Sequence, residues 1–273
     1  MSQLLQRIKF KSSMLQTCPL CGVNHPILVQ GLVSNPEDVN QKMPVLDRGY
    51  SFCNCSNIFY TDWSNMDPSI YDEEYNDRYN NDNITDSINK YADVYYPVLK
   101  GFNPDIQKFA EIGSINHVLL DRASEEGWET LGIDINPNVI SENHKIDICD
   151  VEKYTLKEKQ DVIWASHIFE HFKDPLKVAE NLYNSLNDDG ILFISMPDPY
   201  FINWTEPHNW VHWHLREHHI MWDMDSFIEK LEDIGFECVQ AIRNDGAGFI
   251  CYGDYHLMFK KDTPGEVMPD AQA

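Results

Sequence analysis

Residues 101–261 alternate between short apolar runs and amphipathic segments, as strands and helices do when they follow one another. The run Asp161–Ala165 is apolar after its first residue, as expected of a strand buried on both faces of a parallel sheet. Pro175 suits the first turn of a helix, and Gly235 suits a helix C-terminus. The pattern predicts a Rossmann-like α/β fold with a doubly wound, mostly parallel sheet. Strands are predicted at 106–112, 130–135, 145–149, 161–165 and 191–196, helices at 118–126, 174–190 and 225–234, and a final antiparallel pair at 238–242 and 255–259.

Composition divides the chain into four zones, and no internal repeat is found. Residues 1–61 are predicted to form a small Cys-rich module, and residues 62–100 an acidic, Tyr-rich helical connector. Residues 101–261 hold the α/β domain. Residues 262–273 contain two prolines and little to bury, which predicts a disordered tail.

Acidic residues far outnumber basic ones in the 273-residue chain: 44 Asp and Glu against 21 Lys and Arg give a net charge of −23. Such a field repels a phosphate backbone and an anionic membrane surface, so neither nucleic acid nor a membrane is an expected partner. No apolar run approaches the ~20 residues of a membrane span, and no signal-peptide pattern is found. The 7 cysteines, an odd number, favour a reducing compartment over a disulfide scaffold, which predicts a cytoplasmic location.

Two segments of the first βαβ unit suit a nucleoside-type cofactor. Gly113 follows the strand 106–112 and lets the backbone approach a ligand closely. Asp134 ends the next strand, where its carboxylate can accept hydrogen bonds from both hydroxyls of a ribose. Either segment alone suits an ordinary strand–turn–helix, but their order within one βαβ unit favours a cofactor site.

From about residue 106 onward, the sequence resembles the class I S-adenosylmethionine-dependent methyltransferases. Glu111-Ile112-Gly113-Ser114 is similar to the start of the family's glycine-rich cofactor loop, and Asp134 matches its ribose-binding acid. Cys149-Asp150-Val151 resembles the segment that meets the adenine. Segments 166–175, 189–197 and 234–237 are similar to later parts of the family's pattern. The resemblance implies S-adenosylmethionine as cofactor, held by Glu111, Gly113, Ser114, Asp134, Ile135, Asp150, Val151 and Ser166.

The cofactor loop departs from that pattern, because the family's second and third loop glycines fall on Ile115 and His117. The branched Ile115 side chain resists a positive φ and is expected to crowd the methionine part of the cofactor or to reshape the loop. A non-catalytic binding or assembly protein with this fold is therefore kept as an alternative. A Rossmann dehydrogenase is a weaker one, because G-x-G-x-x-G is absent.

Four cysteines near the N-terminus suit a structural zinc ion, which takes four thiolates in a tetrahedron. Cys18 and Cys21 have the usual C-x2-C spacing, whereas Cys53 and Cys55 form a C-x-C pair whose sulfurs can point to one side of a strand. His25 is a spare ligand, and four ordinary buried thiols are the alternative. The order resembles a subset of methyltransferases with an N-terminal zinc-ribbon module, an apolar strand (here 58–60) and an acidic Tyr-rich helix (here 70–75). The resemblance implies that the substrate is a sugar or another small metabolite.

Seven of the 11 histidines lie between residues 167 and 219, beside four tryptophans. A lid over a substrate, formed by 200–222, and a simple aromatic packing layer are both consistent with this. A second metal held by His208 and His212, or by His214 and His218, is not expected. Glu170 and His171 follow the fourth strand and are candidate general bases, although capping of their own loop is the alternative. Taken with these features, the resemblance implies a methyltransferase acting on a small-molecule substrate, with its oligomeric state left open.

Overall fold

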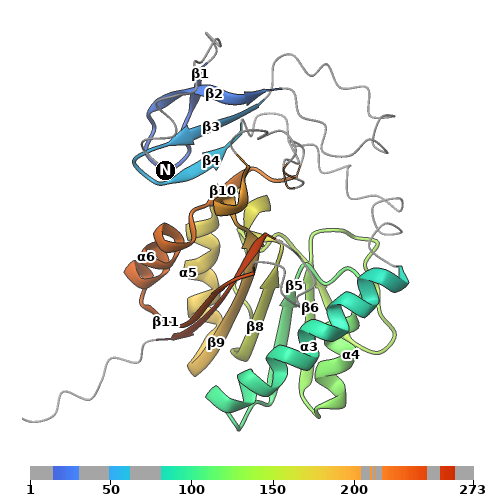
Figure 1. Cartoon of the computed structure of the whole chain (residues 1–273). Helices are drawn as coiled ribbons and strands as arrows, with labels where there is room; N and C mark the ends of the chain where they lie inside the picture. The colour runs from blue at the N-terminus through green and yellow to red at the C-terminus, as the bar shows by residue number, and fades with distance from the viewer. Residues whose placement is uncertain are drawn as a thin grey trace, which may run out of the picture.

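A computed structural model describes residues 15–30, 49–61, 81–203, 210, 212, 217–244 and 253–261. The expected helix at 70–75, the tail at 262–273, and Trp204, His208, Trp213 and His214 lie outside these ranges. The described residues form a seven-stranded and a five-stranded sheet (Figure 1). Among them, no helix combines the length and the apolar character that crossing a membrane requires.

The larger sheet has the strand order β11-β12-β9-β8-β5-β6-β7. Its chain order runs outward from β5 in one direction and from β8 in the other, so the predicted doubly wound sheet is confirmed. Parallel pairing joins β9 through β7, and β12 is antiparallel to both β9 and β11. In such a sheet, ligands bind beyond the carboxyl ends of the strands at the point where the order reverses, here between β5 and β8. The strands are β5 (Lys108–Ile112), β6 (Glu129–Asp134), β7 (Lys145–Ile148), β8 (Gln160–Ser166), β9 (Leu186–Pro197), β11 (Phe236–Arg243) and β12 (Asp254–Lys261).

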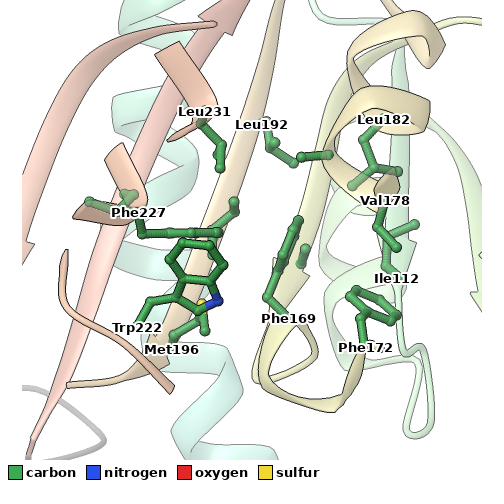
Figure 2. Packing of buried hydrophobic residues seen from close by; sticks show 14 of the residues in the cluster. Ile112, Phe169, Phe172, Val178, Leu182, Leu192, Met196, Trp222, Phe227 and Leu231 are labelled. Carbon is green, nitrogen blue, oxygen red and sulfur yellow. The ribbon is translucent and has the colours of Figure 1, made fainter. Parts of the chain in front are cut away.

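Helices cover both faces of this sheet (Figure 1). Helices α3 (Asp82–Phe102) and α4 (Val118–Glu125) pack on one face, and α5 (Pro175–Ser185) and α6 (Met224–Ile234) pack on the other. The caps follow ordinary rules, since Gly235 ends α6 at φ 115 as predicted. Figure 2 shows the α5–α6 side of the core, with side chains of both helices packed against those of β9.

The acidic, Tyr-rich stretch contributes α3, whose aromatic side docks on the sheet. Tyr91, Tyr95 and Tyr96 are buried. The Tyr96 hydroxyl donates to the Leu119 carbonyl at 2.7 Å, which ties α3 to α4. The Tyr95 hydroxyl lies 2.5 Å from Nδ1 of His256 in β12. These contacts satisfy the polar ends of the rings, so the apolar bodies are buried without an unsatisfied hydroxyl.

The residues predicted to end the helix 174–190, Asp188-Asp189-Gly190, lie inside strand β9. Helix α5 ends at Ser185, and Leu186 already pairs with Gln160 of β8. The register then shifts, with Asp189 at φ 62. A Cβ on Gly190 would lie 2.8 Å from the Asn187 carbonyl oxygen, so this turn needs a glycine there. These residues do form a turn, as predicted. The turn falls within a strand because Leu186 already pairs with β8, and local sequence does not report that pairing.

The smaller sheet joins the N-terminal segment to the C-terminal half of the chain. It contains β1 (Leu15–Thr17), β2 (Asn24–Gln30), β3 (Gly49–Cys53), β4 (Ile58–Tyr60) and β10 (Ile220–Trp222). Strand β10 pairs antiparallel with β4, and the Thr61 N–H donates to the His219 carbonyl at 3.0 Å. In Figure 1 this sheet lies at one end of the larger sheet. The His219 N–H donates to the Glu170 carbonyl at 2.7 Å, so this end is the carboxyl edge.

Candidate functional site

The loop after β5 forms a backbone cradle at the carboxyl edge of the sheet. Gly113 has φ +79, and its N–H donates to the Ile133 carbonyl at 2.8 Å. A Cβ at Gly113 would lie 3.2 Å from Cδ1 of Ile168, so the glycine is required by both conformation and space. Ser114 is fully buried, and its hydroxyl interacts with the Glu111 carboxylate and lies close to Gly132, where an added Cβ would come within 2.9 Å of it.

Only one of the two departures from the loop's glycine pattern occupies a glycine-like conformation. His117 lies at φ 59 and ψ 2, directly before α4. Ile115 is not among the described residues with positive φ, and its N–H donates to the Gly113 carbonyl at 3.0 Å. The loop therefore accommodates the branched Ile115 by keeping it in an ordinary conformation, and the left-handed position falls on the unbranched histidine.

We expect His117→Gly and Ile115→Gly to differ in stability. Glycine at 117 relieves a left-handed conformation worth about 1–2 kcal/mol, which offsets the roughly 1 kcal/mol entropic loss of a glycine. Glycine at 115 brings that loss with no relief and removes a half-buried side chain. Denaturant unfolding should leave His117→Gly within about 1 kcal/mol of the parent and lower Ile115→Gly by more. Equal losses in both variants would contradict this conformational assignment.

Two carboxylates from neighbouring strands frame the same edge. Glu111 is 6% exposed, and a hydrogen bond with the Ser114 hydroxyl partly offsets the cost of burying its charge. Burial raises the pKa of Glu111 to about 8, and the nearby Asp134 carboxylate acts in the same direction. Asp134 ends β6, where its Oδ1 accepts from the Asn136 N–H at 2.8 Å. Burial also raises the pKa of Asp134. A ligand that carries an ammonium group and a ribose matches these acceptors.

We expect Glu111→Gln to flatten the pH dependence of stability. The folded-state pKa of about 8 lies above the ordinary 4.5, so the contribution of Glu111 is complete below pH 4.5 and is lost as pH rises through 8. The parent should therefore lose on the order of 5 kcal/mol more than the variant across this range. The measurement is denaturant unfolding at several pH values. The exposed Glu237→Gln is the control, and parallel curves for the parent and Glu111→Gln would contradict the prediction.

The segment after β7 lies beside Asp134. The Cys149 N–H donates to the Asp134 carbonyl at 2.8 Å. Asp150 accepts from the Glu152 N–H at 3.1 Å and from Lys153 Nζ at 2.7 Å, so its own turn already uses both carboxylate oxygens. Val151 is buried. Ile135 is 45% exposed at this edge, where an apolar side chain offers contact area for a flat ring. Ser166, the last predicted cofactor residue, is half-buried at the end of β8.

Glu170 and His171 lie in a short 3-10 helix, η4 (Phe169–His171), that follows β8. Glu170 is fully buried, and burial raises the pKa of its carboxyl group. Its Oε1 lies 3.4 Å from Nδ1 of His167. The other nitrogen of His167, Nε2, lies 3.1 Å from Oδ2 of the fully buried Asp254. His167 therefore bridges two buried carboxylates, and its φ of 51 shows that the loop holds it in a sparsely populated conformation.

The histidine-rich stretch was predicted to reach this edge, and its described members do. Nε2 of His212 lies 3.5 Å from Oδ1 of Asp254, and the rings of His171 and His218 have centroids 5.0 Å apart. Asp254 was not predicted. It comes from β12, far away in the sequence, and only the antiparallel pairing of β12 with β9 brings it opposite Pro197. Nothing in the sequence around Asp254, which follows Gly253, indicates a functional residue.

Three of the four cysteines predicted to bind zinc converge in the structure. The sulfurs of Cys18, Cys21 and Cys53 lie within 4.8 Å of one another, and those of Cys21 and Cys53 are 3.5 Å apart. Cys55 is exposed and does not belong to this group of three, although it is close enough to affect the charge of Cys21. Burial raises the pKa of the Cys18 thiol to about 12. His25 Nε2 is buried with no hydrogen-bond partner among the described residues.

A sequence profile of the methyltransferase domain matches residues 62–241. No curated protein matches the chain in sequence. An S-adenosylmethionine-dependent methyltransferase from Archaeoglobus fulgidus shares 18% identity at a TM-score of 0.53, covering 71% of this chain and 100% of its own.

Two further solved structures have the same fold. An S-adenosylmethionine-dependent methyltransferase from Clostridium acetobutylicum matches at 11% identity and a TM-score of 0.51, covering 71% of this chain and 97% of its own. The PH0226 protein from Pyrococcus horikoshii matches at 14% identity and a TM-score of 0.53, covering 70% of this chain and 100% of its own. The profile spans more than half of the chain, and the fold and strand order agree with it. The chain belongs to the methyltransferase domain family.

Proposed function

We propose that this protein is an S-adenosylmethionine-dependent methyltransferase that acts on a sugar or another small metabolite. The observation that carries the proposal is the carboxyl edge of β5, β6 and β8. There the loop at Gly113, the buried Glu111 carboxylate and the Asp134 carboxylate meet. Glu170 and His171 in η4, with the adjacent His167, follow the neighbouring strand, β8, at the same edge.

The chain's own residues have distinct roles in this proposal. Gly113 and Ser114 approach the cofactor with backbone and hydroxyl, Asp134 accepts from its ribose, and Glu111 and Ser166 face its amino-acid part. Ile135, Asp150 and Val151 hold its base. S-adenosylmethionine, when bound, supplies an electrophilic methyl group. Glu170 and His171 promote loss of the proton from an oxygen, nitrogen or carbon nucleophile of the substrate, and burial at this edge limits the access of water.

The proposal is tested with methyl-labelled S-adenosylmethionine and a cell extract separated by size. We expect the label to enter the low-mass fraction, and the Asp134→Ala protein to transfer none of it. Label that enters only the protein or nucleic-acid fraction would contradict a small-molecule substrate. A folded parent protein that transfers no label but binds S-adenosylhomocysteine would favour the second candidate, a non-catalytic binding protein. The histidine at a loop position that the family fills with glycine, His117, is the observation behind that candidate.

We also propose a structural zinc ion held by Cys18, Cys21, Cys53 and Cys55. The three converging sulfurs support it, and the exposed Cys55 is near enough to complete the set by a side-chain rotation. We expect about one zinc per chain at this cluster, and a loss of that ion in Cys21→Ser. Elemental analysis of protein purified without added metal is the measurement. Cys238→Ser, at a half-buried cysteine in β11, is the matched control and should keep the ion.

The proposed location is the cytoplasm, and the proposed partners are small molecules only. All six described cysteines are free, which suits a reducing compartment. The net charge of −23 disfavours nucleic acid and anionic membranes as partners.

A further inference from the structure

Three metal-ligating side chains converge at the carboxyl edge, separate from the cysteine cluster. Ligand atoms of Glu170, His171 and His218 lie within 4.8 Å of one another, and all three residues are buried. Oε1 of Glu170 is 3.9 Å from Nε2 of His218. This separation is too long for a hydrogen bond. It is within the span of two ligands that each lie about 2.0–2.2 Å from one zinc ion.

The protonation of His218 is fixed by its backbone partner. Nδ1 of His218 lies 2.9 Å from the His212 carbonyl oxygen. A carbonyl only accepts, so Nδ1 carries the proton, and in the neutral ring Nε2 presents a lone pair. That lone pair faces the buried Glu170 carboxylate, whose Oε1 lies 3.9 Å from it and 3.4 Å from Nδ1 of His167. A divalent cation placed between His218 Nε2 and the Glu170 carboxylate would be bound by both, and a histidine anchored through Nδ1 is the usual arrangement of a metal ligand.

We propose that Glu170, His171 and His218 bind a divalent transition-metal ion such as Zn²⁺; the role of this ion in the reaction rests on the proposed function. Two imidazoles and one carboxylate are the ligand types that zinc prefers when thiolates are absent. Three protein ligands leave a coordination position open, as in catalytic rather than structural zinc sites. A substrate oxygen would take that position, so this inference favours an oxygen-bearing substrate such as a sugar hydroxyl.

The surrounding structure holds the three ligands in place. Glu170 and His171 belong to η4, and the His219 N–H donates to the Glu170 carbonyl at 2.7 Å. The hydroxyl of the buried Tyr50, from β3, donates to the His218 carbonyl at 2.7 Å. The two sheets therefore position the ligands from opposite sides. His167 lies 3.4 Å from Glu170 Oε1 and gives the carboxylate a second contact, as the outer partners of metal ligands do.

Sequence spacing did not point to this site, because the two parts of the ligand set are distant in the chain. His214, which could share a helix face with His218, lies outside the described residues. The pairing of β10 with β4 and the His219–Glu170 bond bring His218 to η4.

The test uses Co²⁺ alone as the probe, added to full-length protein that has been stripped of metal. In Cys21→Ser, which removes a thiolate ligand of the other cluster, we expect one Co²⁺ per chain. The absorption spectrum of this Co²⁺ complex should show visible d–d bands but lack the near-ultraviolet charge-transfer bands of thiolate ligands. Adding His218→Gln should weaken this binding at least tenfold. His144→Gln, at a buried imidazole between α4 and β7, is the matched control and should leave the binding unchanged.

The outcomes separate this inference from the proposed function. If Cys21→Ser binds no Co²⁺, or binds it equally well with and without His218→Gln, the metal site is wrong. The first result needs no change in Glu170, His171 or His218, and cooperative unfolding of Cys21→Ser in denaturant shows that this variant is folded. S-adenosylhomocysteine is titrated into the same samples. Metal binding without S-adenosylhomocysteine binding would overturn the proposed function alone, and the reverse result would overturn the metal site alone.

Discussion

Asp134→Asn should weaken binding of S-adenosylhomocysteine by about 30-fold or more while the domain stays folded. A carboxylate that accepts hydrogen bonds from a ribose contributes on the order of 2–4 kcal/mol, most of which depends on its charge. The asparagine keeps an oxygen for the Asn136 N–H, so the turn after β6 is retained. Asp134→Ala removes both and should bind more weakly still. Calorimetric titration of the two variants and the parent gives the three affinities.

The matched control is Asp161→Asn, at the opposite edge of the same sheet. Asp161 Oδ2 accepts from the backbone N–H groups of Gln107 and Lys108 at 2.8 and 2.9 Å. Its substitution should lower stability without changing the affinity for S-adenosylhomocysteine. If Asp134→Asn binds as tightly as the parent, or if both asparagine variants lose affinity equally, Asp134 does not hold the ribose.

Trp222→Ala should lower the free energy of unfolding by about 3–5 kcal/mol, the range for a large aromatic side chain removed from a core. Trp222 lies in β10, is fully buried and packs against Phe227 with ring centroids 5.3 Å apart (Figure 2). Because β10 completes the smaller sheet, the loss should also loosen the cysteine cluster. We therefore expect faster alkylation of the buried Cys18 and Cys53.

Two measurements check this prediction, namely denaturant unfolding and the rate of thiol alkylation in native buffer. Ile140→Ala, at a side chain that is 79% exposed, is the control and should change neither. A Trp222→Ala protein that loses stability but alkylates at the parental rate would show that β10 does not link the two sheets energetically.

Local sequence was enough to predict the elements of the larger sheet, because each is marked by its own periodicity and terminal residues. The strand at 108–112, the Asp174-Pro175 start of α5 and the Gly235 cap of α6 all occur where the pattern predicts them. The placement of Gly113 and Asp134 at one edge was also predictable, since Gly113 directly follows β5 and Asp134 ends the next parallel strand, β6. Parallel pairing brings such positions to one edge of a sheet without any further information.

Contacts between distant segments could not be predicted in this way. Asp254 meets His167 only through the pairing of β12 with β9, and His218 meets Glu170 only because β10 joins β4. The conformation of the cofactor loop was also beyond the pattern. Because two loop glycines of the family are replaced in this chain, a steric conflict was expected at Ile115. The backbone instead places the left-handed conformation at His117. These features depend on tertiary packing, which a local window does not contain.

The central claim is that the carboxyl edge between β5 and β8 is a site for S-adenosylmethionine. Calorimetric titration of the folded, full-length parent protein with S-adenosylhomocysteine tests it most directly. The account predicts saturable binding of one ligand per chain, with adenosine competing for the same site. A protein that unfolds cooperatively, and is therefore folded, yet releases no heat and shows no shift in melting temperature at millimolar S-adenosylhomocysteine would contradict it.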